Sequence, residues 1–373
     1  MLAAVQHSLN QPLDVTDVRI DGPRAGEVQV RMMATGVCHS DLSVIDGVIP
    51  FLVPSVLGHE GAGIVEEVGT GVTKVKPGDH VIVSWVATCN TCFFCMHGQQ
   101  QLCQSGLAGF GSMEDGTSRL AIGDTTVYHG LNAATFAERT ILRQTAVVKI
   151  PDDVPFDVAA LVGCGVTTGV GAAIRTAKVQ PGERVAVIGC GGVGLNVIQG
   201  CRLAGAAAII AVDPNPARRE AATRFGATHT LEGGDTAVAG VQGLTDGIGA
   251  DAAFEVVGKP ALQRQAYDMT RPGGRTVMVG VGSMETETAF NTLFMTVSEK
   301  AILGCFYGSA SPERDFPWIL QLWRAGRLDL ESLVTQTIPL QRINEAFDAM
   351  RRGEQLRTIV TMANGHTPWP TTL

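Results

Sequence analysis

The chain has 373 residues, of which 45% are apolar and 17% charged, and its formal net charge is −8. This length is too great for one ordinary core, so we expect two domains, and the composition is that of a globular protein. A negative charge without a basic stripe argues against a nucleic-acid partner. The N-terminus has no charged segment followed by an apolar one, so we predict no secretory signal and a cytoplasmic location.

Short strands and turns dominate the first third of the chain. Residues 27–32 alternate in polarity, and residues 61–69 read as a strand that starts and ends at glycine. Residues 75–83 form a turn that leads into a strand. We therefore expect a β-rich body whose loops carry histidine and cysteine side chains.

Four cysteines lie close together in the loop 89–103, with the spacing C-x2-C-x2-C and then a fourth after seven more residues: Cys89, Cys92, Cys95 and Cys103. Four thiolates gathered in this way form a closed tetrahedral site for Zn²⁺, which favours sulfur ligands. The chain has nine cysteines in all and no readable export signal. We therefore interpret the cluster as a metal site and not as a disulfide framework.

Three more metal-binding side chains lie outside this loop, namely Cys38, His59 and Cys164. Two thiolates and one imidazole are the ligand set of a catalytic zinc that keeps its fourth position open. The three residues are far apart in the sequence, and a lone buried cysteine is usually inert packing. Their spacing alone therefore leaves both interpretations open.

From about residue 166 onward, buried strands alternate with helices, which predicts a doubly wound parallel sheet. Strands are expected at 185–188, 209–212, 252–257, 276–281 and 301–306, and helices at 195–204 and 217–225. The tail predicts helices at 316–325 and 343–351 and a strand at 358–362, and we expect it to pack on the first domain. The last ten residues, from Asn364, predict no regular element.

A transmembrane helix is the alternative for the apolar stretch 185–212. Five glycines between Gly189 and Gly200, together with three polar side chains, break this stretch into strand, turn, helix and strand. We therefore predict no membrane span.

The first turn of the predicted sheet carries a dinucleotide fingerprint, G-x-G-x-x-G, formed by Gly189, Gly191, Gly192, Val193 and Gly194 with Cys190. It follows a strand and opens a helix, which is the context that the motif requires. Glycines let the backbone approach a pyrophosphate at the helix N-terminus, where free N–H groups favour an anion. A glycine-rich turn without a ligand is the alternative.

Asp213 ends the next predicted strand, 19 residues after Gly194. A carboxylate there accepts hydrogen bonds from the adenosine ribose and repels a 2′-phosphate, so we predict NAD over NADP. Arg218, five residues further on, could contact the ribose, which weakens the prediction of NAD over NADP.

These segments together resemble the zinc-containing alcohol dehydrogenases of the medium-chain dehydrogenase/reductase superfamily. The resemblance rests on residues 38–41, 58–63, the four-cysteine loop, 163–165 and 189–194, and it covers essentially the whole chain. Residues 115–119 and 161–169 bring it closest to the animal-type and class III enzymes and to related bacterial forms. It implies an α/β fold with a GroES-like catalytic domain at 1–165, a Rossmann domain at 166–307, and a segment at 308–373 that returns to the catalytic domain.

The resemblance also implies catalytic roles for Cys38, Ser40, Asp41, His59, Glu60 and Cys164. Cys38, His59 and Cys164 would bind the catalytic zinc, and the four clustered cysteines would bind a structural zinc, giving two Zn²⁺ per chain. Ser40 would bond the alcohol oxygen and start a proton relay. Asp41 would orient His59 through its other ring nitrogen, and Glu60 would lie behind the metal.

Further residues would contact the cofactor and the substrate. His39 and Arg357 would lie at the pyrophosphate, and Thr168 and Val193 at the nicotinamide. The pocket wall would be formed by Ile49, Trp85, Leu131 and Val281, with Gly130 where a large aromatic often stands. An apolar channel of this kind favours medium-chain aliphatic or aromatic primary alcohols and their aldehydes, although ordinary core packing is the alternative for these residues.

Two departures from the family limit the substrate. Ser43 occupies the position of a relay histidine in many members, so the relay must end in water or in another group such as His39. Leu107 occupies the position of an arginine in the glutathione-dependent class III enzymes, and residues 47–54 hold no acid. A glutathione–formaldehyde adduct would therefore lack its partners, whereas a mycothiol-type adduct stays possible.

Two rival interpretations remain. One is a nicotinoprotein, in which NAD(H) does not leave the enzyme. The other is a non-enzymatic zinc-bound redox sensor or structural protein. A homodimer or homotetramer is expected, because the strand at 301–306 could extend the sheet across a two-fold axis.

Overall fold

The computed structural model describes residues 1–362, and the chain divides into two compact units. Among the described residues, the first unit comprises 1–164, 311–320 and 330–362, and the second comprises 165–310 and 321–329. The tail from Asn364 lies outside the described residues. The sequence-based domain boundaries at 165 and 307 fall near two of these divisions.

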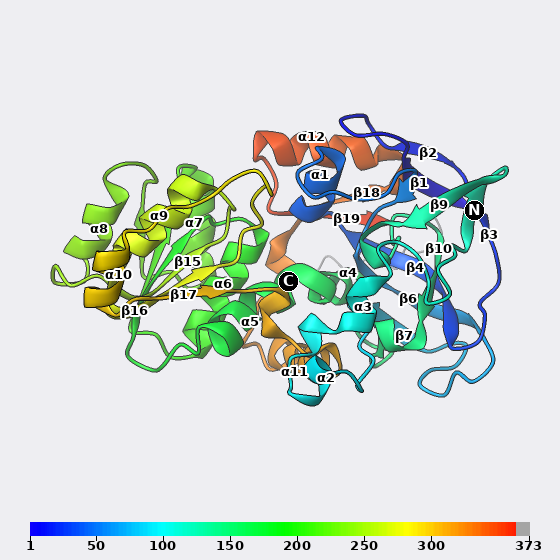
Figure 1. Ribbon diagram of the computed structural model, residues 1–373, viewed down its shortest axis with the longest axis horizontal. Coiled ribbons are helices and arrows are strands. Elements are labelled where there is room, and N and C mark those ends of the chain that lie inside the picture. Colours follow the sequence, from blue (N-terminus) through cyan, green and yellow to red (C-terminus); the bar gives the residue numbers. More distant parts are fainter. Residues whose placement is uncertain (363–373) are drawn as a thin grey trace, which may run out of the picture. The chain divides into compact units, whose positions relative to one another are not determined.

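The first unit contains two sheets (Figure 1). One sheet has the order β2-β1-β5-β9-β8-β3, formed by β1 (Leu2–Gln6), β2 (Asp14–Asp17), β3 (Arg19–Ile20), β5 (Ser55–Val56), β8 (Leu120–Ile122) and β9 (Thr125–His129). The other has the order β11-β7-β6-β4-β19-β18 with β10 paired to β4, formed by β4 (Glu27–Gly36), β6 (Glu60–Val68), β7 (His80–Val83), β10 (Arg139–Arg143), β11 (Val147–Lys149), β18 (Val334–Pro339) and β19 (Arg357–Thr361).

Strand β4 organises the larger sheet of the first unit. Its alternating apolar residues Val28, Val30 and Met32 are fully buried and belong to the main core cluster of this unit. The predicted strands at 27–32 and 61–69 are confirmed, and β4 continues beyond the prediction to Gly36. Strand β19 pairs antiparallel with the end of β4, so the C-terminal segment supplies a strand to this sheet.

The second unit is built around one parallel sheet with the order β14-β13-β12-β15-β16-β17. Its strands are β12 (Arg184–Ile188), β13 (Ala208–Val212), β14 (His229–Leu231), β15 (Ala250–Glu255), β16 (Thr270–Met278) and β17 (Ala301–Gly304). The helices between them are α6 (Gly192–Leu203), α7 (Pro216–Phe225), α8 (Ala237–Gly243), α9 (Pro260–Met269) and α10 (Thr292–Ser298). This is the doubly wound order of a dinucleotide-binding fold, so the predicted fold class is confirmed.

The ends of several strands differ from the prediction, most of all at β16. Strand β16 starts at Thr270 and runs through Pro272 and two glycines, where proline and glycine predict a turn. Its pairing with β15 shifts register between Ala250 and Ala252, which accommodates the irregular start. Strand β17 ends at Gly304, two residues earlier than expected.

Among residues 1–362, one helical run fits a membrane span by length and composition alone. The helical run Phe156–Thr176, which includes α4 (Phe156–Leu161) and α5 (Thr167–Gly171), is long and apolar enough to cross a bilayer. Its most apolar window is 83% buried inside the protein, as in the core helix of a globular unit. The stretch 185–212 forms β12, α6 and β13, so a transmembrane helix there is excluded.

Candidate active site

The three separated metal-binding residues meet in the first unit. The ligand atoms of Cys38, His59, Glu60 and Cys164 lie within 4.8 Å of one another, and all four side chains are buried. Cys38 precedes helix α1 (His39–Ile45), and His59 directly precedes β6. Cys164 lies in the π-helical turn Val162–Val166, a rare conformation that is frequent at functional sites. The donor set of two sulfurs and one imidazole fits a zinc ion.

Asp41 positions two residues of this cluster, Cys38 and His59, through hydrogen bonds. Its Oδ1 accepts hydrogen bonds from Gly58 N at 3.0 Å and from His59 Nδ1 at 3.2 Å, and its Oδ2 accepts from Cys38 N at 3.3 Å. Because a carboxylate only accepts, His59 must carry its proton on Nδ1. The other ring nitrogen, Nε2, is then left to bind a metal, as the resemblance implied.

The electrostatics of the cluster favour the charged forms of the His59 and Cys38 side chains. Burial, the largest influence, lowers the pKa of His59, but the charges of Asp41 and Cys38 and hydrogen bonds to both raise it overall to about 10. A hydrogen bond from Cys164 is the largest cause that brings the pKa of Cys38 well below its usual range, against the opposing effect of burial. A metal ion that binds here would take the place of the His59 proton, since metal binding releases protons from its ligands.

Backbone geometry before His59 requires glycine. Gly58 has φ +89°, and a Cβ on it would lie 2.6 Å from Phe136 N and 2.6 Å from Thr135 Oγ1. Any larger residue would be strained and would push His59 away from Asp41. The Gly-His-Glu motif is therefore explained by packing as well as by chemistry.

Glu60 pairs with Arg357 in the interior of the first unit. The Arg357 guanidinium donates to Glu60 Oε2, and the two side chains are 6% and 0% exposed. The arginine thus neutralises a buried carboxylate beside the metal ligands. The predicted place of Arg357 at a pyrophosphate stays a prediction.

The residues around Ser40 lie on helix α1. Ser40 is partly exposed, and its Oγ lies 3.8 Å from Cys38 Sγ, so its hydroxyl stands beside a candidate metal ligand. Ser43 lies one turn further along, and its carbonyl accepts from Ile49 N at 3.0 Å. His39 is exposed.

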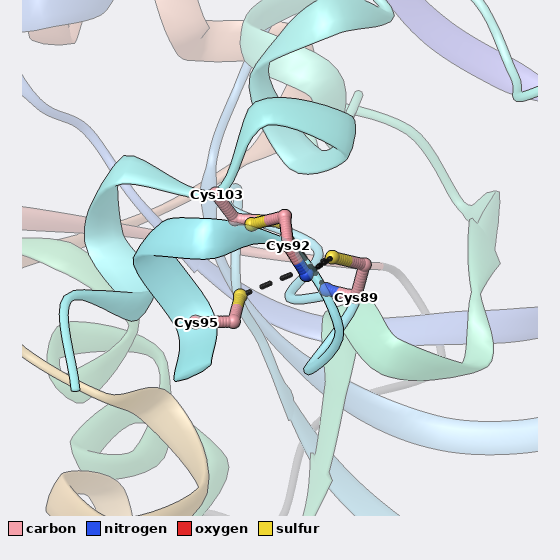
Figure 2. Close-up of side chains that lie close together, drawn as sticks. All are labelled: Cys89, Cys92, Cys95 and Cys103. Carbon is pink, nitrogen blue, oxygen red and sulfur yellow. Dashed lines mark hydrogen bonds between the residues drawn. The ribbon is translucent and has the colours of Figure 1, made fainter. Parts of the chain in front are cut away.

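The four clustered cysteines gather as the spacing predicts (Figure 2). The sulfurs of Cys89, Cys92, Cys95 and Cys103 lie within 4.8 Å of one another. Cys95 lies on α2 (Phe93–Met96), and Cys103 precedes α3 (Gln104–Ala108). Backbone N–H groups of Cys92 and Gly106 donate to Cys89 Sγ at 3.3 Å and to Cys103 Sγ at 3.4 Å, which favours thiolates.

The sulfur separations fit a metal ion better than a disulfide. Cys89 Sγ and Cys95 Sγ are 4.0 Å apart, whereas a disulfide bond is about 2 Å long. Two sulfurs bound to one Zn²⁺ at about 2.3 Å lie roughly 3.8 Å apart in a tetrahedron. Hydrogen bonds from the Thr91 backbone and side chain lower the pKa of Cys89 to about 6, and burial raises that of Cys95 to about 12.

The nucleotide fingerprint has the expected geometry in the second unit. Gly189 follows β12 with φ +94°, and a Cβ on Gly194 would lie 1.8 Å from Gly189 O, so the turn closes only with glycine. A Cβ on Gly191 would meet no protein atom within 4 Å. The backbone there faces open space at the start of α6, where a pyrophosphate could approach it. Val193 and Thr168, on α6 and α5, are partly exposed.

Asp213 stands at the end of β13 beside this turn. Its Oδ2 accepts from Cys190 N at 2.8 Å and its Oδ1 from Asn215 N at 2.9 Å. The carboxylate is thereby fixed next to the fingerprint, where a ribose would need an acceptor. The neighbouring Arg219 donates to Asp213 O at 2.7 Å, and Arg218 is partly exposed.

The predicted pocket residues fall in both units. Trp85 lies edge-on to His59, with 6.4 Å between the ring centroids. Ile49, Trp85 and Leu131 are partly buried and pack against the main core cluster of the first unit. Val281 lies in the second unit and is 56% exposed.

Comparison with known families agrees with this geometry. Residues 24–152 match the family described as the alcohol dehydrogenase GroES-like domain, and residues 192–324 match the family of zinc-binding dehydrogenases. The chain is 42% identical over 370 residues to an S-(hydroxymethyl)glutathione dehydrogenase of Paracoccus denitrificans, covering 96% of this chain and 98% of that protein. The chain belongs to the zinc-containing alcohol dehydrogenases of the medium-chain dehydrogenase/reductase superfamily.

Two other relatives of this alcohol dehydrogenase are also named as alcohol dehydrogenases. It is 41% identical over 362 residues to an NDMA-dependent alcohol dehydrogenase of Amycolatopsis methanolica, covering 96% and 98% of the two chains. The crystal structure of a benzyl alcohol dehydrogenase from Acinetobacter calcoaceticus matches with a TM-score of 0.91 at 33% identity, covering 97% and 99%. The expected enzyme class, an oxidoreductase acting on alcohols, is thus confirmed.

The segment 115–119 of this alcohol dehydrogenase has a structural role that its sequence did not predict. Arg119 is 1% exposed, and its guanidinium pairs with Glu27 on β4 through Nε at 2.9 Å and Nη2 at 2.5 Å. It also pairs with Asp115, whose pKa falls because of hydrogen bonds from Thr117 and then from Arg119. The segment therefore ties the chain after the four-cysteine loop to the main sheet. The sequence indicates this ion pair only through the acid and the base of Asp-Gly-Thr-Ser-Arg at 115–119.

His129, at the end of β9, was also missed. It is 2% exposed, its Nε2 accepts from Arg119 N at 3.4 Å, and its Nδ1 has no hydrogen-bond partner among the described residues. Burial and then the charge of Arg119 lower its pKa to about 4. This histidine is therefore neutral in the folded alcohol dehydrogenase near neutral pH.

Proposed function

We propose that this chain catalyses the NAD-dependent, reversible oxidation of primary medium-chain aliphatic or aromatic alcohols to aldehydes. The observation that carries the proposal is the buried cluster of Cys38, His59 and Cys164 with Asp41 behind the imidazole. We propose that this cluster holds a catalytic zinc and that the four-cysteine loop holds a second, structural one.

The residues of the first unit would divide the catalytic work. Zinc would act as a Lewis acid that makes the alcohol hydroxyl more acidic and polarises the carbonyl in the reverse direction. Ser40 would accept the hydroxyl proton and pass it to water, because Ser43 offers no imidazole one turn further along. Asp41 keeps His59 in the tautomer that leaves Nε2 for the metal.

The second unit would hold the hydride acceptor, NAD. The fingerprint turn would bind the pyrophosphate through backbone N–H groups at the start of α6. Asp213 supports NAD over NADP, because a buried carboxylate would repel a 2′-phosphate.

The apolar character of the predicted pocket supports the substrate class. Ile49, Trp85 and Leu131 offer no charge to a polar tripeptide adduct, and Leu107 stands where the glutathione-dependent enzymes carry arginine. We therefore propose no activity on the glutathione–formaldehyde adduct. A mycothiol-type adduct remains an alternative substrate.

A nicotinoprotein with non-dissociating NAD(H) is a second candidate, and the 41% identity to an NDMA-dependent alcohol dehydrogenase supports it. Gel filtration of the loaded enzyme distinguishes the two. Release of the nucleotide supports the dissociating enzyme, whereas co-elution supports the nicotinoprotein.

One experiment tests the main proposal. NADH formation is measured over a panel of primary, secondary and aromatic alcohols, with zinc analysis on the same sample. We expect activity on primary alcohols and two zinc ions per chain. The matched pair Ser40→Ala and Ser43→Ala separates the roles on α1: the first should lower kcat by about 10²-fold or more, and the second should change it little. A single zinc per chain without activity would favour the redox-sensor alternative.

We propose further that the chain forms a homodimer or a dimer of dimers through the second unit. Strand β17 is one of the two edge strands of the parallel sheet, and helix α10 before it exposes apolar side chains. A cytoplasmic location likewise stays a prediction.

A further inference from the structure

The loop after β9 carries an unusual backbone. Leu131, Asn132 and Ala134 have φ values of 49°, 59° and 54°. Asparagine tolerates this left-handed region, but leucine and alanine rarely adopt it. Such conformations persist only where the surrounding structure enforces them, and they concentrate at ligand-binding sites.

Asn132 supplies the enforcing contact. Its side-chain Oδ1 accepts from Gly111 N at 2.9 Å. Gly111 O in turn accepts from His129 N at 2.8 Å. Gly111, in the loop that follows the four-cysteine cluster, is therefore hydrogen-bonded to both ends of the segment 129–132.

The same loop is anchored on its other side by aromatic stacking. Phe110, next to Gly111, is 50% exposed and has φ 41°. Its ring stacks on Phe51, with 5.0 Å between centroids and 16° between planes. Three separate loops of the first unit are thus joined by the contacts between Asn132 and Gly111 and between Phe110 and Phe51.

A small cavity beside this loop, of about 20 Å³, is lined by Ser112, His129 and Asn132 among others. It has room for about one water molecule. Leu131 itself is partly buried against the main core cluster. Its position thus depends on the Asn132 contact as well as on packing.

We propose that Asn132 is a specificity-determining residue that fixes Leu131 on the wall of the alcohol pocket through its hydrogen bond to Gly111. This inference rests on the proposed function. Leu131 would contact the distal carbons of a medium-chain or aromatic alcohol, which a two-carbon alcohol does not reach. Loss of the contact would therefore weaken selection for the larger substrates and spare the chemistry at the metal.

Three variants test the proposal. Asn132→Gly removes the amide but tolerates the left-handed backbone, whereas Asn132→Asp retains an oxygen that can accept from Gly111 N. Asn10→Gly is the matched control, because Asn10 also has φ 59° and is exposed in a separate turn. For each variant, kcat/KM is measured for benzyl alcohol, 1-hexanol and ethanol, together with KM for NAD, zinc content and thermal stability.

We expect Asn132→Gly to lower the ratio of kcat/KM for benzyl alcohol to that for ethanol by about tenfold, mostly through KM. The Asp variant should recover most of the ratio, and Asn10→Gly should match the wild type. An unchanged ratio in an active Asn132→Gly enzyme would overturn the inference and leave the proposed function intact. A crystal structure of that variant with Leu131 still at positive φ would overturn it as well. Inactivity of the wild type on every alcohol would instead refute the proposed function.

Discussion

At the scale of single residues, Asp41 decides whether the candidate zinc ligands can act together. It is fully buried and accepts three hydrogen bonds, from Cys38 N, Gly58 N and His59 Nδ1. Two of these donors are backbone groups, one of the ligand Cys38 and one of Gly58, the residue before His59. One carboxylate therefore fixes the imidazole and the backbone at both ligands. An amide in its place would present N–H donors to at least one of these N–H groups.

We therefore expect Asp41→Asn to weaken zinc binding at the catalytic site by about 10- to 100-fold. Zinc retained per chain is measured during titration with a chelator. Asp46→Asn, just after the end of the same helix, is the control, because Asp46 is exposed and pairs with the surface residue Arg351. Equal zinc retention by the two variants would contradict the role of Asp41, and the four-cysteine zinc should stay in both.

His129 gives the stability of the protein a predictable dependence on pH. Burial and the charge of Arg119 lower its pKa to about 4 in the folded state, against about 6.5 in an unfolded chain. Between these values the unfolded chain binds more protons, so stability falls as the pH drops from about 6.5 to about 4 and the loss is complete below that. The contribution is on the order of 3 kcal/mol.

A non-titrating substitution isolates this effect. We expect the free energy of unfolding of His129→Gln to fall less steeply than that of the wild type between about pH 6.5 and pH 4. Urea unfolding at a series of pH values, with zinc held at one concentration, gives both curves. Parallel curves would show that His129 does not carry the acid sensitivity.

At the scale of structural elements, the buried pair of Arg119 and Glu27 connects the segment after α3 to strand β4. Both side chains are nearly inaccessible, so removal of one partner leaves a charge in the interior. A broken pair of this kind costs about 3–5 kcal/mol, whereas an exposed pair costs less than about 1 kcal/mol.

We predict that Arg119→Met destabilises the protein by a few kcal/mol and that Arg24→Met costs less than about 1 kcal/mol. Arg24 is the matched control, because it also pairs with Asp115 but is 54% exposed. The double variant Arg119→Met with Glu27→Leu should regain most of the loss. Thermal or urea unfolding measures all three, and equal losses for the two arginines would refute the special role of the buried pair.

At the scale of the whole molecule, the elements that were predictable are those encoded locally. The fingerprint turn and its strand and helix occupy about twenty consecutive residues, and the four cysteines share one short loop. The missed features join distant parts of the chain: Arg119 and Glu27 are 92 residues apart, and Glu60 and Arg357 are 297 apart. The left-handed conformation of Leu131 also escapes prediction, because its own side chain disfavours it and only the tertiary contacts impose it.

The dimer that we propose would form through an exposed apolar surface of the second unit. Leu293, Phe294 and Val297 on α10 are 65%, 62% and 68% exposed. The adjacent strand β17 pairs with β16 on one side only within the described residues, so its other edge has backbone groups available for a ladder. An isologous pairing of two such edges around a two-fold axis would cover both features at once.

We accordingly expect the wild type to sediment as a dimer or tetramer, and Leu293→Lys with Val297→Lys to weaken dimer formation by about 100-fold or more, since a charge must be buried at the contact. Sedimentation at several protein concentrations measures the dissociation constant. Met96→Lys is the control, because Met96 is 70% exposed on the four-cysteine loop of the first unit. Dissociation by Met96→Lys, with the α10 variant still associated, would move the interface to that loop and refute pairing through β17.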